Sequence, residues 1–186
     1  SNLDIETIKN KNYLLSIGRL TRQKNFLFLI DCFNEIANLI KDLDLIIIGE
    51  GEEKKKILSK IKKYSLQNRV FLENYKNNVF KYFKYCKCFI LSSLWEDPGF
   101  VLVEAAFCNK PIISSNCFNG PSEFLQNGKG GFLYKSNSKD DFILKFNEFL
   151  KIDKLQLNKK LILSKKEVKK YTFHNHYIEF KKIINF

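Results

Sequence analysis

Short apolar runs alternate along this chain with longer segments in which apolar residues recur at helical spacing. The apolar runs predict strands buried on both faces, and the longer segments predict helices that bury one face. Strands are expected at residues 13–18, 43–48, 70–72, 88–91, 111–114 and 131–134. Helices are expected at residues 25–40, 52–66, 79–85, 100–108, 121–126, 140–150, 154–170 and 173–184.

Alternation of this kind predicts an α/β fold with a doubly wound, mostly parallel six-stranded sheet and helices on both faces. Residues 13–150 would form a Rossmann-like core and residues 151–186 a tail of C-terminal helices, together one domain over residues 1–186. In the lysine-coated helix at 52–66, Ile57, Leu58 and Ile61 are expected to face the core. Such sheets bind ligands at the carboxyl ends of their strands, so the loops that follow the strands are the places to look for chemistry.

Composition narrows the class of protein. Hydrophobic residues make up 45% of the chain, which excludes a disordered polypeptide. No apolar run approaches the ~20 residues of a transmembrane helix, and no basic stretch followed by an apolar segment marks a secretion signal. A cytoplasmic protein is therefore expected. Because the chain begins with Ser1 and Asn2 rather than Met, we interpret it as a piece of a longer protein.

The net charge of +12 comes almost wholly from lysine, since only three of the 32 basic residues are Arg. Nucleic-acid binders usually favour arginine, so nucleic acid is not expected as a partner. An excess of Lys together with Asn and Ile is typical of the codon bias of an AT-rich genome. Attraction to an anionic membrane surface is a second interpretation of the same charge.

Five cysteines are present, an odd number, and most lie inside apolar runs. Cys86 and Cys88 are too close for the usual zinc spacing, and no His lies near them. We expect buried free thiols in a reducing compartment.

The loop after the first strand, residues 18–25, contains Arg19 and Lys24 between a strand and a helix. Two cations near a helix N-terminus would form a site for a diphosphate. The alternative is that both are solvated loop charges.

The loop after the fourth strand is richer in candidate chemistry. Asp97 is expected to cap the helix at 100–108, with Pro98 at its first position and Gly99 leaving room for close approach of a ligand. Glu104 follows in an otherwise apolar helix, where a carboxylate is costly unless it is hydrogen-bonded. The hydroxyls of a sugar or ribose would satisfy it, and a structural bond to a serine or a backbone amide is the alternative.

Other motifs are weaker. The loop at 114–123 opens a helix with Gly120 and Pro121 and offers amides to the same pocket. The segment at 49–53 starts like a dinucleotide fingerprint but lacks its third Gly, and its acidic side chains would repel a pyrophosphate. His174 and His176 form an isolated pair for which a solvated or packing role is expected.

In order along the chain, these motifs resemble the donor-binding half of the retaining GT-B glycosyltransferases of family 4, the glycosyl transferases "group 1". The resemblance covers residues 13–150. It is carried by the segments 16–25, 48–51, 68–72, 119–123 and 130–133, and by Glu96 and Glu104 at the spacing of the family's Glu-x7-Glu motif. The chain departs from the family at Glu73, where many relatives have Gly, and at Pro98, where many have Phe before a Gly; here Gly99 follows and Phe100 comes next.

The resemblance implies roles for individual residues. Arg19 and Lys24 match the pair that holds the donor's diphosphate, Glu104 matches the carboxylate that binds the ribose, and Glu96 matches the one that contacts the donor sugar. Of these, Arg19, Lys24 and Glu96 would be catalytic. The rest of the implied donor site consists of Gly18, Pro98, Gly99, Phe100 and Val101, with Val70 and Phe71 cradling the nucleobase.

The implied function is transfer of a hexose or N-acetylhexosamine from a nucleotide-diphospho-sugar to a glycan or lipid-linked acceptor in cell-surface polysaccharide biosynthesis. A UDP-sugar is favoured as the donor, and neither a metal nor another cofactor is expected. The acceptor domain would be an N-terminal half absent from this chain, so the chain alone is expected to be inactive. The expected place is the cytoplasm, with a peripheral position on the inner face of the plasma membrane left open. The alternative function is a stand-alone nucleotide-binding or regulatory module.

Overall fold

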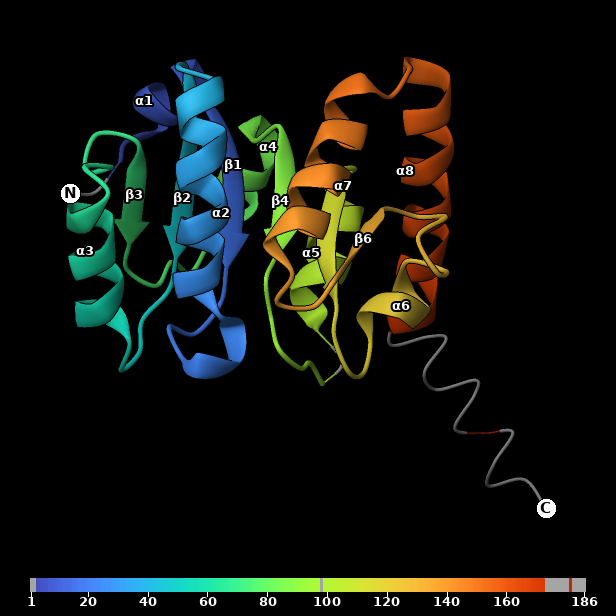
Figure 1. Ribbon diagram of the computed structural model, residues 1–186. Helices are drawn as coiled ribbons and strands as arrows, with labels where there is room; N and C mark the ends of the chain where they lie inside the picture. The colour runs from blue at the N-terminus through green and yellow to red at the C-terminus, as the bar shows by residue number, and fades with distance from the viewer. Residues whose placement is uncertain (1–2, 98, 173–180, 182–186) are drawn as a thin grey trace.

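A single parallel sheet forms the centre of the molecule, in a computed structural model that describes residues 3–97, 99–172 and 181 (Figure 1). Its strand order is β3-β2-β1-β4-β5-β6, and all neighbouring strands are parallel. The six strands are β1 (Asn12–Ile17), β2 (Leu43–Ile48), β3 (Val70–Glu73), β4 (Cys88–Leu91), β5 (Ile112–Asn116) and β6 (Phe132–Lys135). The doubly wound α/β fold expected from the alternating pattern is confirmed.

Helices cover both faces of this sheet. They are α1 (Ile5–Asn10), α2 (Phe26–Leu39), α3 (Lys54–Lys63), α4 (Phe80–Tyr85), α5 (Phe100–Phe107), α6 (Pro121–Phe124), α7 (Lys139–Lys151) and α8 (Lys154–Val168), with 3-10 turns η1 (Arg22–Lys24) and η2 (Lys169–Tyr171). Helices α2, α3 and α7 pack on one face, and α1, α4 and α5 pack on the other, where α8 contacts α5.

Alternate residues of a strand supply the two cores. Leu45 and Ile47 of β2 pack beneath α2 and α3, whereas Ile46 and Ile48 pack on the opposite face. All four side chains are at most 1% exposed. Successive strand residues point to opposite faces, so a strand covered on both sides must be apolar throughout. The apolar run at 45–48 is the direct consequence, and Asp44, the one polar residue of β2, is buried in an ion pair with Lys11 and Arg69.

The helices of the structure differ from the sequence expectations at three points. Helix α1 was not expected, and Leu58 is 48% exposed rather than directed inward, because the buried face of α3 is set by Ile57 and Ile61 one turn apart. Helix α5 is capped by Gly99, with φ 77°, and not by Asp97, which is exposed. The helix expected at 173–184, with His174 and His176, lies outside the described residues apart from position 181.

The five cysteines are all free thiols, four of them buried and Cys108 half-buried. Burial raises the pKa of Cys86 to about 12 and also raises that of Cys88. Among the described helices, none is long and apolar enough to cross a membrane.

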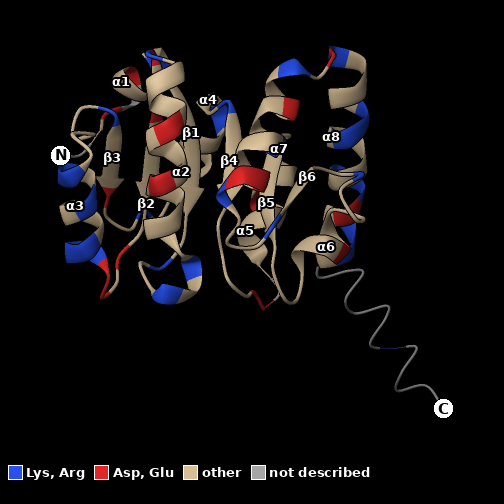
Figure 2. Cartoon of the chain, viewed as in Figure 1, with Lys and Arg blue, Asp and Glu red and all other residues tan. Residues whose placement is uncertain are grey.

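The carboxyl ends of all six strands meet at the lower edge of the sheet in Figure 1. Strand β1 lies between β2 and β4, so the chain winds outward in one direction from β1 to β3 and in the other from β4 to β6. This reversal opens a crevice beside the end of β1, where ligands bind in folds of this kind. Basic and acidic loop segments both occur along this edge, while α3 and α8 carry lysines along their length (Figure 2).

Candidate functional site

A cleft of about 450 Å³ lies at the carboxyl ends of β1, β2 and β3. The ends of β1 and β2 and the loops that follow them contribute residues 17–19 and 48–50, and the loop after β3 contributes Tyr75, Lys76 and Val79. The floor is backbone against backbone, because a Cβ at Gly49 would lie only 1.9 Å from the carbonyl oxygen of Gly18. Position 49 therefore has to be glycine, and the cleft presents peptide groups close to any bound ligand.

Arg19 is the cation that follows directly on β1, and it lines this cleft. Its side chain is exposed and has no ion-pair partner among the described residues. An exposed guanidinium at the mouth of a cleft offers planar, paired donors that match phosphate oxygens. This placement suits the diphosphate contact expected of it, which remains a prediction.

Lys24 meets Glu96 at the same edge of the sheet. Its Nζ lies 2.6 Å from Oε1 of Glu96, although the two residues are 72 positions apart. The aliphatic part of Lys24 runs over Gly18, whose missing Cβ would be 3.2 Å from two of its carbons. The structure thus joins the two loops that the sequence singled out independently.

Backbone bonds tie the same two loops together. The amide of Leu94 donates to the carbonyl of Gln23 at 2.8 Å, and the Gln23 side chain donates back to the carbonyl of Trp95 at 2.9 Å. The hydroxyl of Ser92 donates to the carbonyl of Lys24 at 2.7 Å. Lys24 and Glu96 are therefore fixed relative to one another by their main chains as well as by their charges.

Glu96 is only 3% exposed, and such deep burial is unusual for a carboxylate. The buried charge is compensated by Lys24 and by the hydroxyl of Ser93, both of which donate to Oε1. The backbone amide of Glu96 donates to the carbonyl of Phe118 at 3.0 Å, so the loop after β5 supports this position too.

Glu104 lies on α5 and faces a second, more apolar cleft of about 400 Å³. The other residues that line this cleft are Phe80, Phe100, Val103, Phe107 and Val168. Within the described part of the chain its carboxylate has no hydrogen-bond or ion-pair partner. The alternative, a structural bond to a serine or a backbone amide, is therefore not seen among these residues. Burial raises the pKa of the Glu104 carboxyl above its usual value. A half-buried acid without a partner is a candidate for binding a ligand.

The remaining predicted donor residues are placed differently. Phe100 is exposed and Val101 half-buried at the start of α5, beside Gly99, whereas Pro98 lies outside the described residues. Val70 begins β3 and is packed in the core at 4% exposure, and Phe71 lies beneath the ammonium of Lys11 at 4.1 Å.

Neither Val70 nor Phe71 belongs to the residues that line the cleft, and the structure places Tyr75 and Lys76 there instead. Lys76 is 3.0 Å from Glu73, which ends β3. The sequence signal for these two is an aromatic residue and a cation two and three positions after the end of a strand.

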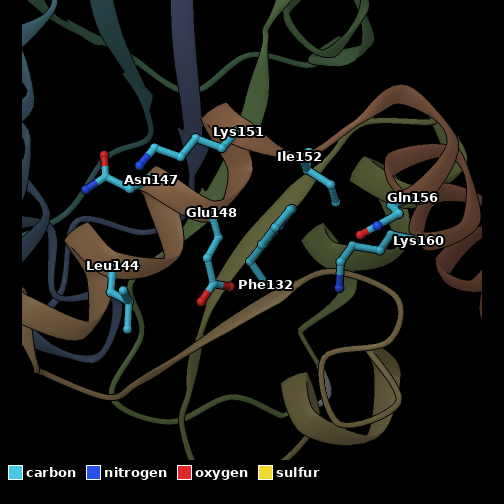
Figure 3. A pocket seen from close by; sticks show the side chains of 8 residues that line it. All are labelled: Phe132, Leu144, Asn147, Glu148, Lys151, Ile152, Gln156 and Lys160. Carbon is cyan, nitrogen blue, oxygen red and sulfur yellow. The ribbon is translucent and has the colours of Figure 1, made fainter.

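Another cleft, of about 420 Å³, lies between α7 and α8, beside the outermost strand β6 (Figure 3). Its wall includes Phe132, the first residue of β6, together with Glu148 and Lys160. The Lys160 ammonium donates to the carbonyls of Gly128 and Gly131 at 2.6 and 2.9 Å and lies 4.9 Å from the centre of the Phe132 ring. Its cation is thus engaged in holding a loop, and the carboxyl edge is the better candidate site.

A doubly wound sheet with a cleft beside the end of β1 is typical of proteins that bind nucleotides. The chain belongs to the family described as glycosyl transferases group 1, which matches residues 3–168. A glycosyltransferase of Methanocaldococcus jannaschii is 42% identical over 117 residues, which is 63% of this chain and 29% of that protein. The N-acetylgalactosamine-N,N'-diacetylbacillosaminyl-diphospho-undecaprenol 4-alpha-N-acetylgalactosaminyltransferase of Campylobacter jejuni is 30% identical over 163 residues, 83% of this chain and 44% of the relative.

Solved structures share the fold. The Anabaena protein HepE, in complex with UDP and glucose, superposes with a TM-score of 0.80 at 20% identity over 95% of this chain and 49% of that one. Staphylococcus aureus TarM, in a complex that contains UDP, gives 0.81 at 22% identity over 93% and 35% of the two chains. The chain spans less than half the length of each of these relatives and structures.

Proposed function

We propose that this chain is the donor-binding domain of a retaining glycosyltransferase that uses a nucleotide-diphospho-sugar. The observation that carries the proposal is the meeting of Lys24 and Glu96, 2.6 Å apart, at the strand ends where Arg19 lines a cleft. A phosphate-binding cation and a sugar-binding carboxylate are needed side by side in such a donor site, since the bond that breaks joins the sugar to the diphosphate.

The chemistry proposed for these residues is electrostatic. As the sugar departs, negative charge develops on the diphosphate, and Arg19 and Lys24 would stabilise it in place of a metal ion. Glu96 would accept a hydrogen bond from a hydroxyl of the sugar, and Glu104 would accept hydrogen bonds from the hydroxyls of the ribose. Retention would follow from attack by the acceptor hydroxyl on the face that the diphosphate leaves, with a phosphate oxygen taking the acceptor's proton. No protein nucleophile is required.

The relatives support a narrower version of this proposal. Their names specify transfer of N-acetylgalactosamine, N-acetylglucosamine or galactose, two of them to diphospho-undecaprenol acceptors. We propose transfer of a hexose or N-acetylhexosamine, with a UDP-sugar as donor, to a glycan or lipid-linked acceptor in cell-surface polysaccharide biosynthesis. The work would take place on the cytoplasmic side of the membrane.

We propose that donor binding and acceptor binding belong to two different domains, on the basis of the length of the relatives. Residues 13–150 would be the Rossmann-like core and 151–186 a helical tail of one donor-binding domain. The acceptor site would be formed by an N-terminal half that this chain does not contain. The relatives are more than twice as long as the segment they share with this chain, which leaves room for such a half.

Calorimetry with UDP, GDP, ADP and uridine tests the proposal, using Arg19→Ala and, as a matched control, Arg22→Ala. Arg22 is an exposed arginine three positions away on η1 and is not part of the cleft wall. Loss of a charge-assisted bond to phosphate costs about 1.5–3 kcal/mol, so Arg19→Ala is expected to weaken diphosphate binding at least about tenfold. Uridine affinity and the control should change little. Equal losses for uridine and UDP would contradict a phosphate site.

The alternative, a stand-alone nucleotide-binding module, predicts the same binding but a different role. Joining the native upstream half distinguishes the two, because only the transferase should then gain sugar transfer from a radiolabelled donor.

A further inference from the structure

The two carboxylate oxygens of Glu96 have different surroundings. Oε1 receives two donors, the ammonium of Lys24 at 2.6 Å and the hydroxyl of Ser93. A carboxylate oxygen accepts about two hydrogen bonds, so Oε1 is saturated. Oε2 has no donor among the described residues. The protein therefore occupies one oxygen and leaves the other available.

The available oxygen faces Gly99. A Cβ at position 99 would lie 3.5 Å from Oε2, in contact with the atom and in the way of anything approaching it from that side. The φ of 77° at Gly99 also disfavours any residue with a side chain. The backbone turn that starts α5 thus keeps the approach to Oε2 open.

Ser93 is itself held in place by the sheet. It is 0% exposed, and its carbonyl accepts a hydrogen bond of 2.6 Å from the hydroxyl of Ser115, which lies in β5. Ser93 follows β4 by two residues, so its position is set by two neighbouring strands. A buried hydroxyl fixed in this way can orient a carboxylate within the narrow tolerance that binding requires.

Lys24 alone would not hold the carboxylate in that orientation once a donor is bound. Its ammonium has three protons on a flexible stem, and in the proposed function some of them turn to the diphosphate. The Ser93 hydroxyl is too deeply buried to reach the donor. In the proposed function it is therefore the partner of Oε1 that stays in place when the donor binds.

Resting on the proposed function, we propose that Ser93 is a positioning residue of the donor site, whose hydroxyl holds Oε1 of Glu96 and leaves Oε2 to accept a hydroxyl of the donor sugar. The residue acts through Glu96 and does not touch the nucleotide. Its loss should therefore weaken binding of the sugar and spare binding of the nucleoside diphosphate.

Calorimetry on this chain tests the proposal with three ligands: UDP, UDP-glucose and UDP-N-acetylglucosamine. Ser93→Ala is expected to weaken the nucleotide-sugar that the chain prefers by about tenfold, with the affinity for UDP little changed. The matched control is Ser16→Ala, which removes another buried serine hydroxyl, bonded to the Ile90 carbonyl at 2.8 Å on the adjacent strand. The control should leave the ratio of the two affinities unchanged.

Two further variants keep the test decisive where Ser93→Ala unfolds. Ser115→Ala removes the hydrogen bond to the Ser93 carbonyl. It should also lower the nucleotide-sugar affinity, but by less than Ser93→Ala does. Ser93→Thr retains the hydroxyl and should retain the ratio. Thermal unfolding followed by circular dichroism reports whether each variant is folded at the assay temperature.

The outcomes separate this proposal from the one it rests on. A wild-type chain that binds UDP and a UDP-sugar, with Ser93→Ala lowering both equally or neither, overturns the role of Ser93 and leaves the donor site standing. A wild-type chain that gains no affinity from the sugar also overturns it, since Oε2 then has no sugar to bind. A wild-type chain that binds no nucleotide overturns the proposed function itself.

Discussion

Replacing Glu104 by Gln should stabilise the fold and weaken nucleotide binding at the same time. The carboxylate is half-buried on α5 and has no hydrogen-bond or ion-pair partner among the described residues. Burial without a partner costs free energy in the empty protein, and glutamine removes the charge while keeping the shape. Opposite effects on stability and binding distinguish a binding residue from a structural one, since replacing a structural residue would lower both stability and affinity.

The magnitude of the two effects follows from the surroundings. A desolvated polar group costs about 1–3 kcal/mol, and the partial exposure of Glu104 reduces this to about 1 kcal/mol or less. For a domain of this size, 1 kcal/mol corresponds to a rise of about 2–4 °C in Tm. On the binding side, a charge-assisted bond to a ribose hydroxyl contributes about 1.5–3 kcal/mol, so affinity for UDP should fall about tenfold or more.

The dependence of stability on pH tests whether the Glu104 carboxylate destabilises the fold when it is charged. The pKa of Glu104 is raised in the folded state above the ordinary value of 4.5. The folded protein therefore binds this proton more tightly than the unfolded chain, and the contribution of Glu104 to stability falls as pH rises through 4.5 and the folded pKa. The gain in Tm from Glu104→Gln should accordingly be present at pH 7 and shrink or vanish near pH 4.

Thermal unfolding at pH 4 and pH 7 and titration with UDP measure both effects. Glu148→Gln is the matched control, because Glu148 is a carboxylate at the opposite edge of the sheet in a surface pair with Lys145. It should change neither Tm nor affinity appreciably. A Glu104→Gln variant that is less stable at pH 7, or that binds UDP as the wild type does, would refute the reasoning.

Three further outcomes are expected. EDTA should leave the affinity for UDP unchanged, because Arg19 and Lys24 are proposed to neutralise the diphosphate; a strict need for Mg²⁺ or Mn²⁺ would contradict that mechanism. A thiol reagent at pH 8 should label half-buried Cys108 first, since burial raises the pKa of Cys86 to about 12 and leaves the other thiols inaccessible; mass spectrometry showing uniform labelling of the folded chain would argue against this. The chain alone should bind a UDP-sugar weakly and transfer nothing in an assay with lipid-linked acceptors, and robust transfer would overturn the two-domain proposal.

The strands could be predicted from sequence because burial on both faces leaves a strong pattern. The run at 43–48 coincides with β2, and all six of its residues are buried. Helix α1 could not be found in the same way, because it has six residues and the single buried side chain described in it is that of Ile8. A helix that short shows no period.

The candidate loops were predictable, but their contacts were not. The sequence singled out Lys24 and Glu96 for separate roles, and nothing in a linear spacing of 72 residues indicates that they form an ion pair. The cap of α5 shows the same limit. Asp97 is a better capping residue than glycine in general, but the turn that buries Glu96 places Gly99 at the cap in a left-handed conformation.

The charge of the whole chain says little about the site, because two of the lysines at this edge of the sheet already have acidic partners. Lys24 is matched by Glu96 and Lys76 by Glu73. Of the three arginines, Arg69 is engaged with Asp44 and with the carbonyl of Ile40. Arg19 is then the cation in the cleft that a diphosphate can take without first separating an ion pair. The excess lysines on α3 and α8 lie outside that cleft, where salt screens their field. In the proposed function, specific recognition of a donor would therefore rest on the placement of Arg19 and on the sharing of Lys24 between two anions, and not on the net charge of +12.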